Sequence, residues 1–220
     1  MRIISVAAPG NGSGKTLALA AILGAYPGRI DAVKFTTVFK DGVNCPRTEK
    51  ACACRSLHGR FTIVTDQAVL GEDETDTGRL TRAGARSVLW CLAQPDAHAE
   101  AWNHLRDDLL GGARVLLTEG NTVVPVLDPD LLIVVMSPQL ARGRWKPDAW
   151  TLVERAHHVV INNHRSDPAA LEALATEVAA VRNGRRPPVE DVSLPLRAWA
   201  DRTLPESLRL LMETDLVERR

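Results

Sequence analysis

The sequence predicts an α/β fold in which a mostly parallel sheet carries helices on both faces. Short apolar runs rich in Val, Ile and Leu recur along the chain, helical patterns lie between several of them, and a glycine-rich turn follows the first run. Strands buried on both faces of a parallel sheet have this near-continuous apolar character. Their alternation with helices is typical of three-layer, Rossmann-like architectures. The expected strands are Ile3–Ala8, Ile30–Phe35, Phe61–Val64, Ser87–Cys91, Arg114–Leu117, Leu131–Met136 and Val159–Ile161.

Four segments carry a helical pattern. Pro95–Leu110 places its apolar residues Trp102, Leu105 and Leu109 on one face. Asp167–Val181 begins with a capping aspartate, and its apolar stripe consists of Leu171, Leu174, Val178 and Val181. The other two expected helices are Gly14–Leu23 and one after Thr203-Leu204-Pro205-Glu206, which has the spacing of a capping box.

The composition favours an ordinary folded protein without a strongly charged partner. The chain has 220 residues, with 27 basic and 27 acidic side chains. This balance argues against binding to nucleic acid or to an anionic membrane. No apolar run reaches the roughly 20 residues that span a bilayer, and the N-terminal run is too short for a signal peptide. We therefore expect a cytoplasmic protein whose cysteines are reduced.

A glycine-rich turn with a Lys-Thr pair follows the first strand. Glycines leave backbone N–H groups free to converge on phosphate oxygens, and the N-terminus of the next helix adds positive potential. In such a phosphate-binding loop, Lys15 neutralises the β and γ oxygens and Thr16 ligates Mg²⁺. An accidental Lys-Thr pair is the alternative, but position, spacing and flanks agree with a nucleoside triphosphate site. The residues expected to bind the nucleotide are Gly10, Asn11, Gly12, Ser13, Gly14, Lys15 and Thr16.

The loop departs from the usual G-x-x-x-x-G-K-[ST] pattern at its first position, which is Pro9 in this chain. Proline fixes φ and lacks a backbone N–H, so the start of the loop must differ from the usual one. Gly10, Gly12 and Gly14 keep the rest of the loop permissive.

An acid at the end of a neighbouring strand usually holds the Mg²⁺ of such a loop, often through water. Glu119, which ends the run Arg114–Thr118, is the first candidate, and Asp66, which follows Phe61–Val64, is the second. Either residue can instead cap a helix or a turn. Further acids lie in the segment 72–77, which can serve a metal or a substrate but can equally begin a solvated helix.

Lys34 lies inside an apolar strand. A lysine in this setting is costly unless it meets an anion, so we expect it to face the γ-phosphate or the substrate. A lysine at a sheet edge, with its charged end in solvent, is the alternative. With Lys15, Glu119 and Asp66, Lys34 completes the expected catalytic set.

The phosphate loop, Lys34 beyond the first helix, and Leu117-Thr118-Glu119-Gly120-Asn121 resemble the dethiobiotin synthetase and cobyrinate amidase group of phosphate-loop proteins. Asp76-Thr77-Gly78-Arg79-Leu80, followed by Ala83-Gly84-Ala85, is similar to a stretch in the adaptor GTPases of molybdopterin-guanine dinucleotide synthesis. The similarity lies in scattered motifs over roughly residues 1–165. It implies the SIMIBI class of P-loop NTPases, which includes MinD-like and signal-recognition GTPases. It also implies a homodimer with substrate bound across the interface.

Two positions depart from these relatives. The ATPases of this class with a second, intermonomer lysine carry it early in the loop, where this chain has Gly10. The synthetase and amidase pattern has further glycines after Glu-Gly, where this chain has Asn121-Thr122-Val123. The resemblance therefore does not identify the substrate or acceptor.

The strand Val159–Ile161 ends in Asn162-Asn163-His164-Arg165. GTPases usually have N-K-x-D here, and the aspartate pairs with the guanine edge. Neither asparagine has an acid three residues later, but an asparagine alone can read adenine, as in the synthetase group. We therefore favour ATP, with GTP as the alternative, and expect Asn162 or Asn163 to contact the base.

Three cysteines lie close together in a polar segment. Cys45, Cys52 and Cys54 form a C-x₆-C-x-C pattern, and His58 follows four residues later. In a reducing compartment these thiols favour a soft metal, either Zn²⁺ with His58 as fourth ligand or an iron–sulfur cluster. Free or redox-active thiols are the alternative. Cys91, in an apolar strand, is expected to be a buried hydrophobe.

Two main functions follow from these expectations. The first is a Mg²⁺-dependent kinase- or ligase-like enzyme of cofactor or metabolite biosynthesis that acts on an unidentified small-molecule or protein acceptor. The second is a nucleotide-switched metal or iron–sulfur chaperone or adaptor that uses the Cys45–Cys54 loop. Residues 1–182 are expected to form the nucleotide-binding domain, with the cysteine-bearing insertion at about 39–58. Residues 183–220 are expected to form an extended connection and a C-terminal helix that packs on this domain.

Overall fold

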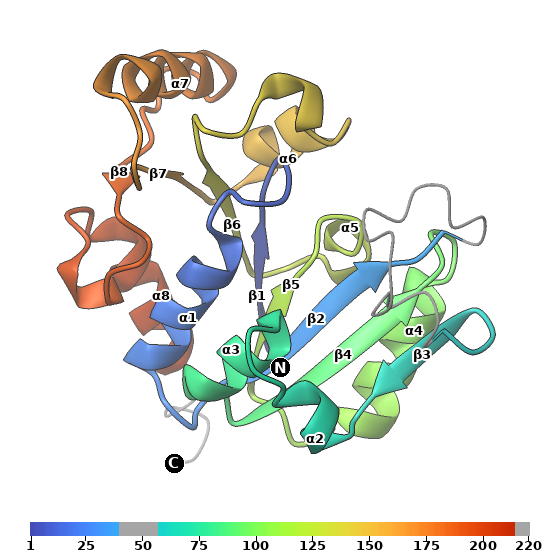
Figure 1. The fold of residues 1–220 in the computed structure, drawn as a ribbon. Coiled ribbons are helices and arrows are strands. Elements are labelled where there is room, and N and C mark those ends of the chain that lie inside the picture. The colour runs from blue at the N-terminus through green and yellow to red at the C-terminus, as the bar shows by residue number, and fades with distance from the viewer. Residues whose placement is uncertain (40–56, 214–220) are drawn as a thin grey trace.

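The apolar runs form an eight-stranded sheet in the computed structural model, which describes residues 1–39 and 57–213 (Figure 1). The strand order is β3-β4-β2-β5-β1-β6-β7-β8. Within this sheet β3 runs antiparallel to β4, and the other adjacent pairs are parallel. The predicted mostly parallel sheet is therefore confirmed. The strands are β1 (Arg2–Ala7), β2 (Asp31–Thr37), β3 (Phe61–Val64), β4 (Ser87–Ala93), β5 (Val115–Glu119), β6 (Leu131–Met136), β7 (His158–Asn162) and β8 (Val189–Glu190).

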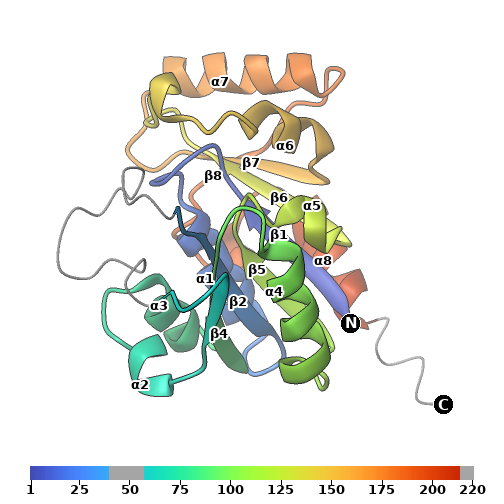
Figure 2. The same cartoon turned by 90° about the vertical axis from the view of Figure 1, so that its right-hand side faces the viewer.

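Helices cover both faces of this sheet, as the alternation predicts (Figure 1, Figure 2). One hydrophobic cluster joins one face of the strands to α1 (Lys15–Ala25), α2 (Gln67–Leu70), α3 (Asp76–Arg82) and α8 (Thr203–Glu213). Two further clusters lie on the opposite face. They contain residues of α4 (His98–His104), α5 (Val124–Leu127), α6 (Ala149–Arg155) and α7 (Pro168–Val181).

The helix predicted over Pro95–Leu110 changes its winding near its end. α4 continues into a π-helical turn, Leu105–Leu109, in which Leu110 N donates to Leu105 O at 2.9 Å. The wider turn rotates the following residues relative to an α-helix. As a result Leu110 is buried and Leu109 is 43% exposed, so the prediction that Leu109 shares the buried face is wrong.

The C-terminal part of the chain joins the same sheet and core. β8 pairs with β7 at its C-terminal end, and the buried Glu190 accepts hydrogen bonds from Ala200 N at 2.9 Å and Asp201 N at 2.7 Å. Leu208 and Met212 of α8 lie in the same cluster as α1. The division of the chain at residue 182 stays a prediction.

Parallel strands place their C-terminal ends at one edge of the sheet, where ligands bind in open α/β folds. In the sheet β5 lies between β2 and β1, so the residues that follow these three strands meet at that edge. No helix within residues 1–39 and 57–213 combines the length and the apolarity needed to traverse a bilayer.

Candidate nucleotide-binding site

The glycine-rich turn lies between β1 and α1, as a phosphate loop requires. Gly12 has φ 86° and Gly14 has φ 99°, which is backbone that residues with a side chain rarely adopt. A Cβ at Gly14 would lie 2.8 Å from Asn162 Nδ2, so this glycine also allows a close approach. Ser13 Oγ and Lys15 Nζ both donate to the Gly10 carbonyl, at 3.1 and 3.2 Å.

Two neighbouring segments hold the start of the loop. The Asn121 side chain donates to Ala8 O at 2.7 Å and accepts from Ala8 N at 3.2 Å. On the other side, Lys146 N donates to Pro9 O at 2.8 Å. Asn121 follows Glu119-Gly120, at a position where the resemblance implies glycine. Its side-chain amide therefore links the end of β1 to the segment that follows β5.

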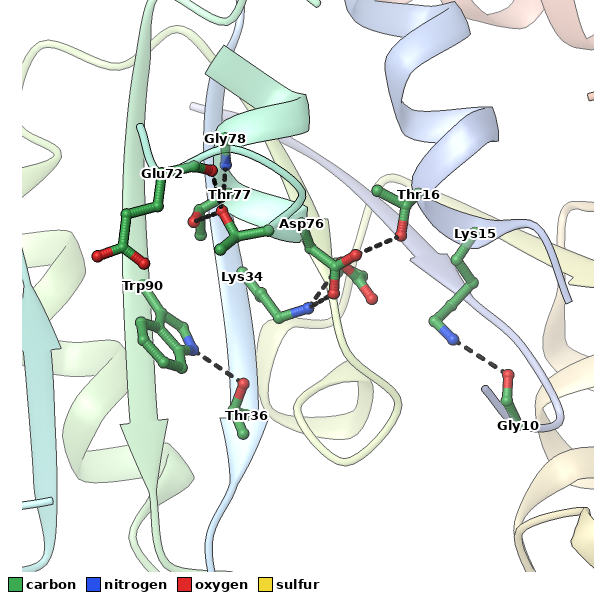
Figure 3. A network of polar contacts seen from close by, with 12 residues as sticks. Gly10, Lys15, Thr16, Lys34, Thr36, Glu72, Asp76, Thr77, Gly78 and Trp90 are labelled. Carbon is green, nitrogen blue, oxygen red and sulfur yellow. Dashed lines mark hydrogen bonds and ion pairs between the residues drawn. The ribbon is translucent and has the colours of Figure 1, made fainter. Parts of the chain in front are cut away.

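A network of polar side chains lies beside the loop (Figure 3). Lys34 from β2 pairs with Asp76 at the start of α3, and its Nζ lies 3.4 Å from Glu119 Oε2 at the end of β5. Asp76 Oδ1 accepts a hydrogen bond from Thr16 Oγ1 at 3.2 Å. The network therefore connects the predicted site residues Thr16, Lys34 and Glu119 through Asp76.

Asp76 is a site residue that the sequence reasoning did not select. It lies in the acidic segment 72–77, where helix α3 begins with Thr75 as its cap. Thr75 Oγ1 accepts from Gly78 N at 3.0 Å, and a Cβ at Gly78 would lie 2.1 Å from Glu72 O. These contacts fix the first turn of α3 and place Asp76 toward α1. The signal that could have identified it is the similarity of Asp76–Leu80 to the adaptor GTPases.

Burial and neighbouring charges shift two pKa values at the site. Burial raises the pKa of the Asp76 carboxyl, but the charge and hydrogen bond of Lys34 and the hydrogen bond of Thr16 outweigh burial and leave the pKa below its ordinary value. Burial lowers the pKa of Lys15, Glu119 opposes this shift, and the charge of Lys146 adds to it. Both results indicate a site in which fixed charges act at short range.

The donors around Thr16 fit a hard divalent cation. A hydroxyl and the carboxylates of Asp76 and Glu119 are oxygen ligands of the kind that Mg²⁺ prefers. Gly120 has φ 149°, and its Cβ would lie 3.0 Å from Phe35 Cβ, so β5 can end beside β2 only with glycine after Glu119. Thr16, Asp76 and Glu119 are therefore the residues that would hold Mg²⁺ here.

The structure places two other predicted residues differently. Asp66 follows the antiparallel strand β3, which runs away from the phosphate-loop edge, and Asp66 Oδ1 caps α2 by accepting from Ala68 N at 2.9 Å. The structure therefore does not bring Asp66 to the loop. The buried Asn162 donates to Ser13 O at 3.4 Å and accepts from His164 N at 3.1 Å, so its amide supports the loop. The Asn163 backbone N–H bonds to Glu190 O.

The cysteine cluster falls outside the described residues, because Cys45, Cys52 and Cys54 lie in the segment 40–56. His58 is described; it is exposed and precedes β3. Within residues 1–39 and 57–213, no group of three or more His, Cys, Asp or Glu side chains is arranged to hold a metal ion. Cys91 is fully buried, as predicted, and burial raises the pKa of its thiol to about 12.

A small polar cluster lies farther along the same edge of the sheet. Thr37, at the end of β2, donates to Thr122 Oγ1 at 3.1 Å and shares a 3.0 Å hydrogen bond with His98 Nε2. His98 is buried, and its Nδ1 has no hydrogen-bond partner among the described residues. Burial lowers the pKa of His98, so its imidazole is neutral near pH 7.

Comparison with known proteins supports the fold. The chain matches no protein-family model and no curated protein sequence. The solved structure of HypB from Helicobacter pylori in complex with nickel aligns with a TM-score of 0.55 at 13% identity, covering 100% of this chain and 89% of that one. The hydrogenase maturation factor HypB from Archaeoglobus fulgidus aligns with a TM-score of 0.53 at 15% identity, covering 96% of this chain and 90% of that one.

A third structure, the cell division protein MinD from Aquifex aeolicus, aligns with a TM-score of 0.44 at 14% identity over 100% of this chain and 98% of that one. At their identities the two HypB structures show the fold alone. They do not confirm the dethiobiotin synthetase and cobyrinate amidase group that the sequence motifs resemble. The chain therefore has the three-layer α/β fold of the phosphate-loop NTPases.

Proposed function

We propose that this chain binds a nucleoside triphosphate with Mg²⁺ and cleaves or transfers its γ-phosphate. The observation that carries the proposal is the network of Lys34, Asp76, Glu119 and Thr16 beside the glycine-rich turn. A phosphate loop alone binds anions, whereas hydrolysis or transfer also needs cations and metal ligands at the γ-phosphate. This network supplies both kinds of group at one place.

Each part of the site has a role that follows from its position. The N–H groups of the loop and of the first turn of α1 bind phosphate oxygens, and Lys15 neutralises their charge. Mg²⁺, when bound, neutralises further charge on the β and γ oxygens. Lys34 is held by two carboxylates on the side of the loop that carries Thr16, where it stabilises charge that develops on the transferred group.

Nucleotide binding with and without Mg²⁺ tests this proposal. We expect the wild-type chain to bind ATP or GTP more tightly with Mg²⁺ than with a chelator. Lys15→Ala should weaken binding about 100-fold or more, because it removes the half-buried cation of the loop. Thr16→Ala should lose only the gain in nucleotide affinity that Mg²⁺ provides, and Thr16→Ser, which keeps the hydroxyl, should retain this gain. Tight binding by Lys15→Ala, or binding that ignores Mg²⁺, would contradict the proposal.

The finer role divides into the two functions that the sequence predicts. For a kinase- or ligase-like enzyme, the acceptor would approach beyond Lys34, where Thr37 and Thr122 carry hydroxyl groups. Such an enzyme hydrolyses nucleotide slowly until its acceptor is present. Screening carboxylate- and amine-bearing metabolites for stimulated phosphate release tests this role, and the absence of any stimulation would count against it.

The second role is a nucleotide-switched metal chaperone or adaptor. It is supported by the three cysteines of the 45–54 segment and by the likeness to HypB, whose solved structure contains nickel. Anaerobic purification followed by metal analysis and an absorption spectrum tests it. We expect bound metal in the wild-type protein and its loss, with altered hydrolysis, in Cys45→Ser or Cys54→Ser, while the buried Cys91→Ser control keeps the metal. Metal-free wild-type protein with an intact fold would contradict this role.

A further inference from the structure

A cationic segment lies against the start of the phosphate loop. It comprises residues 137–148, between β6 and α6, and carries the exposed side chains Arg142, Arg144 and Lys146. Two backbone contacts fix it there. Lys146 N donates to Pro9 O at 2.8 Å, and a Cβ at Gly10 would lie 2.9 Å from Arg144 O. The segment therefore has a fixed position relative to Pro9 and Gly10.

The charges of the described site are incomplete for a triphosphate. Lys34 is compensated by Asp76 and Glu119, which leaves Lys15 as the cation of this network without a paired carboxylate. A Mg²⁺–triphosphate complex still carries net negative charge, so a second uncompensated cation would favour its binding. Gly10, at the start of the loop, has no side chain to provide one.

Lys146 meets the requirements for this second cation. Its backbone is anchored to the loop, its side chain is exposed, and no described residue forms an ion pair or hydrogen bond with its ammonium group. An exposed ammonium group that no described residue pairs can bind a phosphate oxygen beside the loop.

We propose that Lys146 provides, within the same chain, a second cation that contacts the terminal phosphate of the bound nucleoside triphosphate. The proposal rests on the proposed function and adds a residue to it. Lys146 then supplies this charge from a segment other than the phosphate loop and from the same chain. The Pro9 carbonyl accepts the backbone N–H of Lys146, which fixes the position of this residue beside the loop.

Binding of a triphosphate and a diphosphate to the same variants tests the proposal. The probes are the β,γ-imido analogue of ATP and ADP, both with Mg²⁺, and the guanine pair in parallel. Lys146→Ala should weaken binding of the triphosphate analogue about tenfold or more and leave the diphosphate within about twofold. Lys146→Arg should retain most of the affinity. Arg155→Ala, which removes an equal charge before β7 at the opposite sheet edge, should change neither value.

The outcomes separate this inference from the function on which it rests. Equal weakening for both nucleotides, or no weakening, would overturn the role of Lys146 while leaving the nucleotide site intact. A wild-type chain that binds neither nucleotide would overturn both. Mixing Lys15→Ala with Lys146→Ala distinguishes the source of the cation. Restored tight binding of the triphosphate analogue would mean that Lys146 acts across a dimer and would contradict the proposal, and an affinity no higher than that of Lys146→Ala alone is the expected result.

Discussion

Asp76 Oδ1 accepts a hydrogen bond from Thr16 Oγ1 at 3.2 Å, so the first residue of α3 is bonded to the second residue of α1. The same carboxylate pairs with Lys34 from β2. One side chain thus connects the phosphate loop, a central strand and a short helix that lies 60 residues later in the sequence. A cation that binds at Thr16 would therefore meet the carboxylate at the start of α3.

Asp76→Asn should raise the Mg²⁺ concentration needed for nucleotide hydrolysis. The amide keeps the size of the side chain but removes the charge that faces Thr16, and loss of a metal-site carboxylate typically costs about 10- to 100-fold in metal affinity. A Mg²⁺ titration of phosphate release measures the change. Asp73→Asn is the matched control, because Asp73 is exposed and pairs only with Arg82 among the described residues. Identical titrations for wild type and Asp76→Asn would refute the metal role.

Lys34→Met should destabilise the fold at neutral pH. The change leaves Asp76 and Glu119 as neighbouring carboxylates without their cation, which costs about 2 kcal/mol for partly buried groups. The lowered pKa of Asp76 gives the sign of the pH dependence. The stabilisation from Lys34 is complete above the ordinary value of 3.8 and disappears as the pH falls through the lower folded-state value.

Urea unfolding of wild type and Lys34→Met at several pH values measures this effect. The difference in unfolding free energy should be largest at pH 7 and shrink below about pH 4. Lys34→Arg, which retains the charge, should lie closer to wild type. A difference that is constant across pH would mean that Lys34 stabilises the strand by packing and not by charge.

Much of the fold could be predicted because burial acts on long, regular elements. Seven strands carry apolar runs that no other structure explains as well, and α7 begins at the predicted cap, where Asp167 accepts from Ala170 N at 3.0 Å. β8 consists of two residues and α5 of four, so neither is long enough to have a period. Their positions depend on contacts with β7 and β1 that a single sequence does not reveal.

The candidate site was predictable only where the chemistry is local. Lys15 and Thr16 follow from the spacing of one loop, and Glu119 follows from one strand end. Asp76 depends on the direction of β3, because an antiparallel edge strand carries Asp66 away and lets α3 bring a later acid back to the loop. Lys146 depends on a backbone contact with Pro9 across 137 residues, for which the sequence contains no signal.

Gly14→Ala should destabilise the protein more than Gly12→Ala. Both glycines have positive φ, so alanine adds backbone strain of about 1 kcal/mol at either position. A Cβ at Gly12 has nothing within 4 Å, whereas one at Gly14 lies 2.8 Å from Asn162 Nδ2 and 2.9 Å from Val192 Cγ2. Thermal and urea unfolding of the two variants measures the difference. Equal losses would mean that Asn162 and Val192 move aside freely.

His98→Gln should reduce the loss of stability that the protein shows on mild acidification. Burial lowers the pKa of His98, so the folded state binds its proton less readily than the unfolded state. Stability is therefore complete above the ordinary value of 6.5 and decreases as the pH falls from there toward the lower folded-state value. Glutamine cannot titrate, and its amide can still bond to Thr37. Burial also lowers the pKa of His158, so the loss of stability that His158 causes on acidification remains in the variant.

Unfolding free energies at pH 7.5 and about 5.5 give the comparison. The decrease between these pH values should be smaller in His98→Gln than in wild type, and the exposed His164→Gln should match wild type. Groups that both proteins share contribute equally to both decreases, so they do not account for the difference. If His98→Gln lost as much stability as wild type, His98 would have to take up its proton without cost. The unbonded Nδ1 would then have a partner, such as a buried water, that accommodates the charged ring.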